Sequence, residues 1–436
     1  MSSTARSQPI IVTRREVERL FRQEGAESAI HEAARERNAI EHAQAMAMTG
    51  ALLRELQKAE AAQGTDRVVV TAPHGPASRL QSLIASGEAG GLSLQPMPSG
   101  GLEAKFDTVD WLGWATVAWA KLKNPVPNPL LEPSQPGPQP LPDKGRIGLL
   151  GDWGTGLYGA PKMAEAILRD RDPFVMLMHL GDVYYAGTKT EMRDRFLEIW
   201  PRRPDTVNRA LNSNHDMYSG GKYFFEDTLA AFGQDASYFA HQNRHWTLVG
   251  LDVAYHDHAI DDRQVNWLKG ILSQAGDRKV ILFSHQQLFS CYEAQGTKLW
   301  GNEGFAAILR SKRIFAWYWG HEHRCAIYQQ PDAASGLWGR CIGHGGMPES
   351  RAKTRDLPRA AGYDKADWRE APAKIDGSGQ RLAPPSLVLE GQNRYIPGEE
   401  DNFTPHGYAV LTFDEQHLIE QVLDPEGKVI YEHQLA

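Results

Sequence analysis

The chain has 436 residues, of which 41% are hydrophobic and 23% charged, and its net charge is −7 at pH 7. This length allows one large domain or two, and the composition is that of a soluble globular protein with a real core. The acidic balance excludes a general nucleic-acid-binding or anionic-membrane surface, so an anionic substrate has to be attracted locally, by metal ions or clustered cations.

The cysteines and the start of the chain indicate a reducing compartment. The three cysteines are too few and too irregularly spaced for a disulfide framework: Cys291, Cys325 and Cys341. The N-terminus has no long apolar segment, so we expect no signal peptide. No run approaches the ~20 apolar residues of a membrane-spanning helix. We therefore expect a cytoplasmic protein without a membrane span.

Residues 1–123 are expected to form a mainly helical N-terminal region of unknown role. Residues 13–62 are rich in Ala, Glu, Arg and Leu, and Thr13 with Glu16 resembles a helix-capping box. Residues 105–122 carry tryptophans near helical spacing, whereas the glycine-rich stretch 87–101 is typical of a loop. This region is a candidate for forming a homo-oligomer.

A proline-rich segment separates this region from the rest of the chain. Residues 124–143 hold eight of the 26 prolines. Proline at this density disfavours helix and central strand and gives a semi-rigid spacer, so we place a linker here. Residues 144–436, which follow the linker, are expected to form the catalytic domain.

Strand and helix patterns alternate from Lys144 onward, which predicts an α/β fold in which a layered β-sheet sandwich is flanked by helices. The apolar run 174–180 is typical of a strand buried on both faces. The tail 407–433 alternates apolar and polar residues around a Pro-Glu-Gly turn, which predicts a closing antiparallel hairpin. Residues 345–405 are polar with many Gly and Pro, and we expect a long loop insertion there.

Potential metal ligands recur where five apolar strands end. A single histidine or aspartate at such a place is more often a hydrogen-bonded or capping residue, but repetition at five strand ends favours a metal site, because carboxylate, imidazole, amide oxygen and phenolate suit hard to borderline cations. The residues are Asp152; Asp182 with Tyr185; Asn214, His215 and Asp216; His285; and His321 with His323. Glycines 151, 181 and 320 stand beside three of these sites and allow close backbone approach.

In order, the motifs are GDWG at 151–154, GDVYY at 181–185, SNHD at 213–216, LFSH at 282–285 and GHEH at 320–323. This ordered set resembles the calcineurin-like metallophosphoesterases and, within them, the purple acid phosphatases. Gly154 and Tyr185 are the features that favour the latter. Two departures are Ser213, where the family has glycine, and Leu282, where it has valine. The resemblance spans about 150–325 and leaves residues 1–143 outside it.

The resemblance implies two metal ions, with Asp182 as the bridging ligand. One metal would be held by Asp152, Asp182, Tyr185 and His323, and the other by Asp182, Asn214, His285 and His321. Tyr185 would be a phenolate on Fe(III), paired with Fe(II), Zn or Mn; a cytoplasmic enzyme could instead use Mn at both positions. Tyr184 competes with Tyr185 as the phenol, and the motif spacing selects Tyr185.

The resemblance further implies a phosphoric ester hydrolase, in which metal-bound hydroxide attacks phosphorus in line and His215 acts as general acid. Asp216 either orients His215 or caps a turn, and His344 and Arg351 are candidates for contacting phosphate. We expect a phosphomonoesterase acting on a small phosphate ester. A phosphodiesterase with the same metals is the alternative, and a non-catalytic scaffold a weaker one, because a scaffold would have no reason to keep every ligand.

Overall fold

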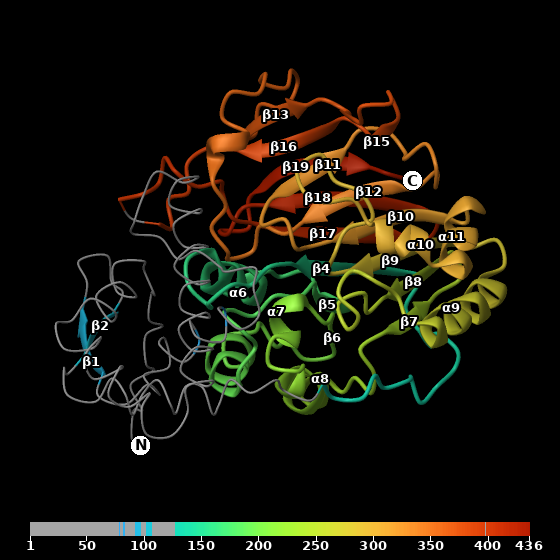
Figure 1. Ribbon diagram of the computed structural model, residues 1–436, viewed down its shortest axis with the longest axis horizontal. Coiled ribbons are helices and arrows are strands. Elements are labelled where there is room, and N and C mark those ends of the chain that lie inside the picture. Colours follow the sequence, from blue (N-terminus) through green and yellow to red (C-terminus); the bar gives the residue numbers. More distant parts are fainter. Residues whose placement is uncertain (1–77, 79–81, 83–91, 97–101, 107–126, 397) are drawn as a thin grey trace, which may run out of the picture.

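The computed structural model of the protein describes residues 78, 82, 92–96, 102–106, 127–396 and 398–436 (Figure 1). In the N-terminal region, strands β1 (Leu92–Pro96) and β2 (Leu102–Phe106) form an antiparallel pair. The loop expected over 87–101 is therefore wrong at β1, where Leu92 and Leu94 alternate with polar residues at the period of a strand. The expectation of a mainly helical region stays a prediction. The helices expected over 13–62 and at 107–122, and the proposed role in oligomerisation, lie outside the described residues.

Two sheets form the body of the protein. The larger has nine strands in the order β13-β16-β11-β12-β10-β9-β8-β7-β3, and the smaller has six in the order β19-β18-β17-β4-β5-β6. The strands of the smaller sheet are β4 (Lys144–Leu150), β5 (Met176–His179), β6 (Val207–Ala210), β17 (Tyr408–Asp414), β18 (His417–Leu423) and β19 (Val429–Gln434). Strands β4, β5 and β6 are parallel, and β17, β18 and β19 are antiparallel, which confirms the hairpin predicted for the tail.

The larger sheet mixes parallel and antiparallel pairs, with β8, β9, β10 and β12 parallel. Its strands are β3 (Gln139–Pro140), β7 (Phe239–Gln242), β8 (Trp246–Gly250), β9 (Lys279–Ser284), β10 (Ile314–Trp319), β11 (Cys325–Tyr328), β12 (Trp338–Ile342), β13 (Asp367–Ala371) and β16 (Ser386–Glu390). A separate pair joins β14 (Lys374–Ile375) to β15 (Arg381–Ala383).

The core lies between the two sheets, and helices cover their outer faces (Figure 1). Ile147 and Met178 of the smaller sheet belong to the same buried cluster as Ile281 and Tyr318 of the larger one. The smaller sheet packs against α6 (Gly159–Arg169), the π-helices η1 (Glu191–Leu197) and η2 (Phe224–Thr228), and α8 (Leu229–Phe232). The larger packs against α9 (Asp262–Ala275), α10 (Thr297–Gly301) and α11 (Glu303–Arg310). The predicted α/β sandwich flanked by helices is confirmed.

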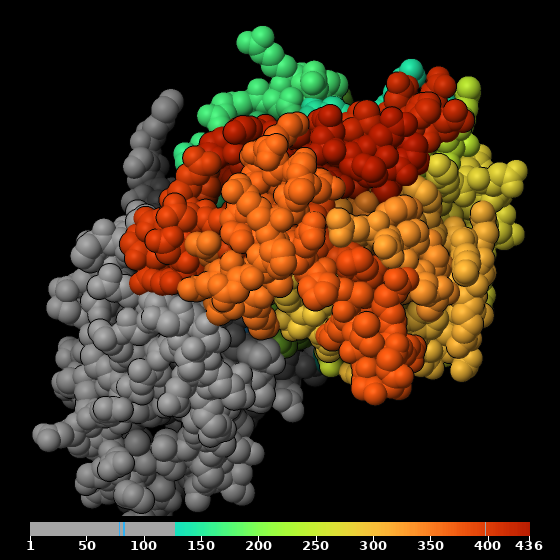
Figure 2. All heavy atoms as spheres, turned by 90° about the horizontal axis from the view of Figure 1, so that it is seen from above, coloured from blue at the N-terminus to red at the C-terminus, as the bar shows by residue number. Residues whose placement is uncertain are grey.

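Residues 345–405 are not one long loop. They contain a short 3₁₀ turn, η3 (Arg351–Lys353), and strands β13 to β16, and β13 and β16 extend the larger sheet beyond β11. In Figure 2 this orange segment lies beside the red C-terminal strands on one face of the molecule. The expectation of a loop failed because these strands are short and, in β13, carry charged residues between the buried Trp368 and Ala371.

The described part of the proline-rich segment lies against the residues that follow it. Gln139 and Pro140 form the edge strand β3, parallel to β7. The backbone N–H of Ser134 donates to Asp235, 2.8 Å away, and the hydroxyl of Tyr255 donates to the carbonyl of Asn128 at 2.8 Å. A domain boundary here stays a prediction. Within the described residues, no helix has both the length and the apolar character needed to cross a membrane.

Candidate metal centre

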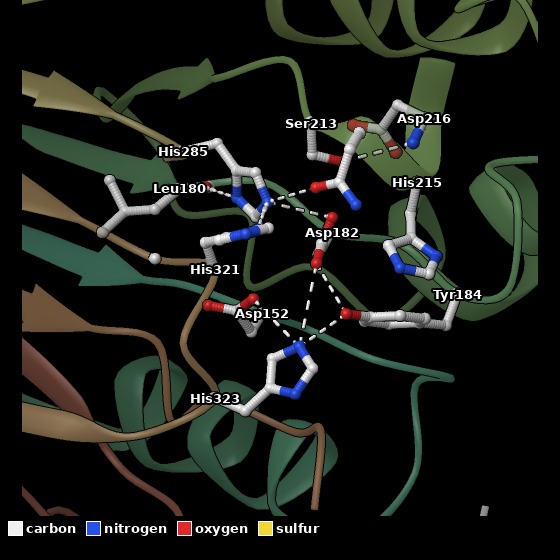
Figure 3. Close-up of polar contacts among 12 residues, drawn as sticks. Asp152, Leu180, Asp182, Tyr184, Ser213, His215, Asp216, His285, His321 and His323 are labelled. Atoms are coloured by element: carbon white, nitrogen blue, oxygen red, sulfur yellow. Dashed lines mark hydrogen bonds and ion pairs between the residues drawn. The ribbon is translucent and has the colours of Figure 1, made fainter. Parts of the chain in front are cut away.

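The ligand candidates lie where strands of the two sheets end. Asp152 follows β4, Asp182 follows β5, and Asn214 begins the short helix α7 (Asn214–Met217) after β6. His285 follows β9, and His321 with His323 follows β10. Because the strands within each of these groups run parallel, their carboxyl ends meet at one edge of each sheet, and the two edges converge (Figure 3).

Glycines make this convergence possible. A Cβ on Gly181, whose φ is +99°, would lie 2.6 Å from Nδ1 of His285. A Cβ on Gly320 would lie 2.7 Å from Oδ2 of Asp152. Any side chain at either position would therefore push apart the loops that bring the two sheets' residues together.

The backbone at four of the candidates is in the left-handed region, which non-glycine residues rarely adopt. The φ angles are 54° at Asp152, 73° at Asp182, 71° at His321 and 51° at His323. Such conformations cost energy and persist where surrounding structure enforces them, often at functional sites. Here they turn side chains from the strand ends toward one centre.

One group of potential ligands consists of Asp182, His285 and His321, whose ligand atoms lie within 4.8 Å of one another. Nε2 of His285 is 3.2 Å from Oδ1 of Asp182 and 3.2 Å from Nδ1 of His321. Oδ1 of Asn214 is 3.0 Å from the same Nε2. Nδ1 of His285 donates to the carbonyl of Leu180 at 2.9 Å, which leaves Nε2 with its lone pair toward the group.

The second group is Asp152, Asp182 and His323, again within 4.8 Å. Nε2 of His323 is 3.6 Å from Oδ1 of Asp152 and 3.9 Å from Oδ2 of Asp182. Asp182 therefore belongs to both groups, one carboxylate oxygen toward each. The structure brings together six of the seven ligand candidates that the sequence suggested, in the two expected sets.

The seventh candidate requires a correction, because the phenol at this centre is that of Tyr184. Its hydroxyl lies 2.6 Å from Oδ2 of Asp182 and 2.6 Å from Nε2 of His323 (Figure 3). Tyr185 instead contributes its backbone: its N–H donates to Glu191 at 2.6 Å, and its carbonyl accepts from His215. Motif spacing selected Tyr185, but adjacent side chains point in different directions, and here the first of the two faces the centre.

The electrostatics suit a cation. Asp152 and Asp182 are fully buried, and three of their four carboxylate oxygens have no hydrogen-bond partner among the described residues. Burial, and then the neighbouring Asp182, raises the pKa of Asp152 well above its usual value. Burial opposes ionisation of Asp182 as well, but His285 and His215 bring its pKa well below the usual value. Burial lowers the pKa of His321 well below that of a free imidazole. Two buried carboxyl groups with unpartnered oxygens, next to three imidazoles, fit a bound metal.

His215 lies beside the centre, next to Asn214 in sequence. Its ring packs on Tyr184, with centroids 4.0 Å apart. Nδ1 donates to the carbonyl of Tyr185 at 2.6 Å, so Nε2 is the nitrogen left for proton transfer. Burial lowers the pKa of His215 to about 4, and Asp182 and the Tyr185 carbonyl act in the opposite direction.

Three weaker candidates are not brought into contact with the centre. The residue that caps α7 is Ser213, which accepts the backbone N–H of Asp216, and the carboxylate of Asp216 has no hydrogen-bond partner among the described residues. Nδ1 of His215 is bound to the carbonyl of Tyr185 and not to Asp216, so neither the capping nor the orienting role is supported. His344 is fully buried, and its carbonyl accepts from Gly407. Arg351 is paired with Glu390 and Asp401 and so is not directed at a phosphate site.

Glu191, which is not among the residues singled out from the sequence, shapes the turn after Asp182. Its carboxylate accepts hydrogen bonds from the backbone N–H groups of Tyr185, Ala186 and Thr188, at 2.6, 3.1 and 3.0 Å. A glutamate in the first turn of a helix just after the GDVYY motif was the available signal, because acidic residues there can bind neighbouring backbone N–H groups.

Comparison with known proteins agrees with this geometry. Residues 145–325 match the model of the calcineurin-like phosphoesterase family. This match confirms the resemblance of this part of the chain to that superfamily. A search of curated proteins finds no match.

Among solved structures, the chain is similar to a purple acid phosphatase from seeds of yellow lupin (Lupinus luteus), at 15% identity and a TM-score of 0.47, over 68% of this chain and 55% of the lupin one. It thus spans little more than half of the lupin protein. It is also similar to PhoD, at 11% identity and a TM-score of 0.38, over 70% and 73% of the two chains. A conserved Streptococcus pneumoniae protein, described as a predicted phosphoesterase, matches at 10% identity and a TM-score of 0.28, over 67% and 98%.

Proposed function

We propose that the protein is a metal-dependent phosphoric ester hydrolase with two cations, and that it acts as a phosphomonoesterase similar to the purple acid phosphatases. One observation carries the proposal. Asp182 is shared by two sets of buried or half-buried ligand residues, with the ligand atoms of each set within 4.8 Å, in the part of the chain that matches the calcineurin-like phosphoesterase family. A single carboxylate between two such sets is the arrangement that a binuclear site needs.

In this proposal Asp152, Asp182 and His323 hold one cation, together with Tyr184 in place of the Tyr185 expected from the sequence. Asp182, His285, His321 and Asn214 hold the other. The Tyr184 phenol is 2.6 Å from ligand atoms of the first set, and a phenolate donor favours Fe(III) there, with Fe(II), Zn or Mn in the second position. Manganese at both positions is the alternative assignment.

When bound, two cations would polarise phosphate oxygens and activate water for attack on phosphorus. The remaining chemistry falls to residues of the chain. In its imidazolium form, His215 is placed to donate the Nε2 proton to the leaving oxygen, because the Nδ1 proton is committed to the Tyr185 carbonyl. General-acid help of this kind contributes roughly 10² to 10⁴ in rate. No serine or cysteine nucleophile is required, so the proposal includes no covalent intermediate.

The test combines metal content with turnover. The purified full chain is analysed for metals and assayed with p-nitrophenyl phosphate and with bis(p-nitrophenyl) phosphate. The proposal expects two metals per chain, faster monoester turnover, and a loss of about 10² or more in kcat for His215→Ala. His433→Ala, which changes an exposed histidine on β19, is the matched control and should behave like the wild type.

Two results would reject parts of the proposal separately. Faster turnover of the diester would favour the phosphodiesterase reading with the same site. Failure to bind metal after reconstitution, with no turnover of either ester, would reject the hydrolase altogether.

A further inference from the structure

Two serines of the N-terminal region are buried against the catalytic domain, next to the candidate centre. Ser78 and Ser82 are helical, four residues apart, and only 0% and 2% exposed. Residues four apart lie on the same face of a helix. Both positions precede residues 145–325, so the calcineurin-like domain does not account for them.

Ser78 reaches the residue that holds the proposed acid. Its hydroxyl donates to the carbonyl of Tyr185 at 2.5 Å, and Oγ lies 3.4 Å from Nδ1 of His215. The Tyr185 carbonyl thus accepts two hydrogen bonds, one from Ser78 and one from His215. A carbonyl has two lone pairs, so the two donors fix its direction together.

Ser82 reaches the other side of the same turn. Its hydroxyl donates to Oε1 of Glu191 at 2.8 Å, and Glu191 accepts the N–H of Tyr185 at 2.6 Å. The peptide groups on both sides of Tyr185 are therefore held by these two serines, the carbonyl directly by Ser78 and the N–H through Glu191 by Ser82. The turn carries Tyr184 on one side and supports His215 on the other.

We propose that Ser78, a residue of the N-terminal region, is a positioning residue for His215 and acts through the Tyr185 carbonyl that both residues bind. Ser82 supports the same turn through Glu191. The inference rests on the proposed function, because it assigns to Ser78 an effect exerted through the proposed acid. It also gives the N-terminal region a part in the reaction at the active site.

The placement of a general acid is measured by its dependence on the leaving group. A p-nitrophenolate leaves readily, whereas the more basic phenolate of phenyl phosphate depends more on protonation. In the full chain, Ser78→Ala and Ser78→Cys are expected to lower kcat for phenyl phosphate by about tenfold, the effect of losing one hydrogen bond that helps to hold the general acid. The loss of kcat for p-nitrophenyl phosphate should be smaller, and KM should change little. Ser78→Thr keeps the hydroxyl and should restore most of the rate.

A double-mutant cycle separates positioning from general support of the fold. In a His215→Ala background, Ser78→Ala should cause no further loss, because the group on which it acts is gone. Ser134→Ala, which removes a serine hydroxyl bound to Asp235 at the surface, is the matched control and should leave both rates unchanged. Metal content is expected to be the same in all these variants.

The inference is overturned if Ser78→Ala and Ser78→Cys keep the wild-type rate on both esters, or if Ser78→Ala lowers the rate equally for both esters and again in the His215→Ala background. Either result can occur while His215→Ala itself is impaired, in which case the proposed function stands and only the role of Ser78 falls. A wild-type chain that binds metal and turns over neither ester would remove the proposed function first.

Discussion

The hydroxyl of Tyr184 lies 2.6 Å from Oδ2 of Asp182, at the point where the two sets of potential metal ligands meet. Burial, followed by the charges of Asp182 and Asp152, raises the pKa of this phenol well above its usual value. The hydroxyl therefore keeps its proton in the metal-free site and donates it to the carboxylate. A bound cation would reverse this balance, because coordination favours the phenolate.

Exchanging each tyrosine separately identifies the phenol at the centre. For the iron-loaded protein we expect Tyr184→Phe to abolish the visible tyrosinate-to-iron band and to weaken metal binding by about 10- to 100-fold, a loss of the size seen when a supporting partner of a metal site is removed. Tyr185→Phe should keep the band, since Tyr185 contacts Glu191 and His215 through its backbone. Absorption spectra with metal titrations measure both effects. A band that survives Tyr184→Phe and disappears in Tyr185→Phe would restore the assignment based on motif spacing.

Removing the shared carboxylate should affect both metals, whereas removing a ligand of one set should affect one. Asp182→Asn is expected to reduce the metal content from two per chain toward none. It should lower turnover by more than about 100-fold, because residues that only hydrogen-bond to a metal ligand already cost up to that much when they are mutated. His323→Ala should leave one metal. Elemental analysis after gel filtration gives the stoichiometry, with His433→Ala as the control. If Asp182→Asn retains one metal, the two sets bind independently and Asp182 does not bridge them.

The sequence was sufficient to predict the layered sandwich and six of the ligand candidates. Alternating strands and helices dictate the layers, and the polar residues directly after apolar strands have to meet at the sheet edges. It was not sufficient to choose between Tyr184 and Tyr185, because that depends on how one turn directs two neighbouring side chains. Nor could it reveal that Arg351 is neutralised by Glu390, or that Ser78 contacts the Tyr185 turn, since both contacts join residues far apart in the chain.

A buried histidine behind the site should make the fold sensitive to acid. His179 packs among Trp153, Phe196 and Trp200, with its ring centroid 4.4 Å from that of Phe196. Burial, reinforced by His285, lowers its pKa to about 3, against an ordinary value of 6.5. The folded state thus binds this proton less readily than the unfolded state. The free energy of unfolding therefore keeps its full value above pH 6.5. It decreases as the pH falls toward 3, because protonation of His179 stabilises the unfolded state.

We therefore expect His179→Phe to change the free energy of unfolding little at pH 7.5 and to remove about 2 kcal/mol of the loss that the wild type suffers between pH 6.5 and 5. Urea unfolding of both proteins at pH 7.5, 6.5 and 5 measures these free energies. His433→Phe, at an exposed position, should keep the wild-type dependence. Equal pH dependence of the wild type and His179→Phe would show that His179 gains its proton without cost to the fold.

A buried ion pair joins the two sheets. Arg340 on β12 and Glu420 on β18 are 1% and 4% exposed at their side chains, with Nη2 and Oε1 2.6 Å apart. The hydroxyl of Tyr318 also donates to Glu420, at 2.9 Å. Taking one partner away leaves the other charge buried without its counter-ion, which typically costs 3–5 kcal/mol, whereas replacing both with apolar side chains costs much less.

Arg340→Met is accordingly expected to lower the free energy of unfolding by about 3 kcal/mol or more, and Arg340→Met with Glu420→Leu to recover most of that loss. Lys144→Met, which breaks an exposed pair with Asp414 across β4 and β17, is the control and should have little effect. Urea denaturation measures all four proteins, and metal content should not change because the pair lies away from the ligands. If the double variant is no more stable than Arg340→Met, the loss comes from packing of the arginine side chain between the sheets and not from the unpaired carboxylate.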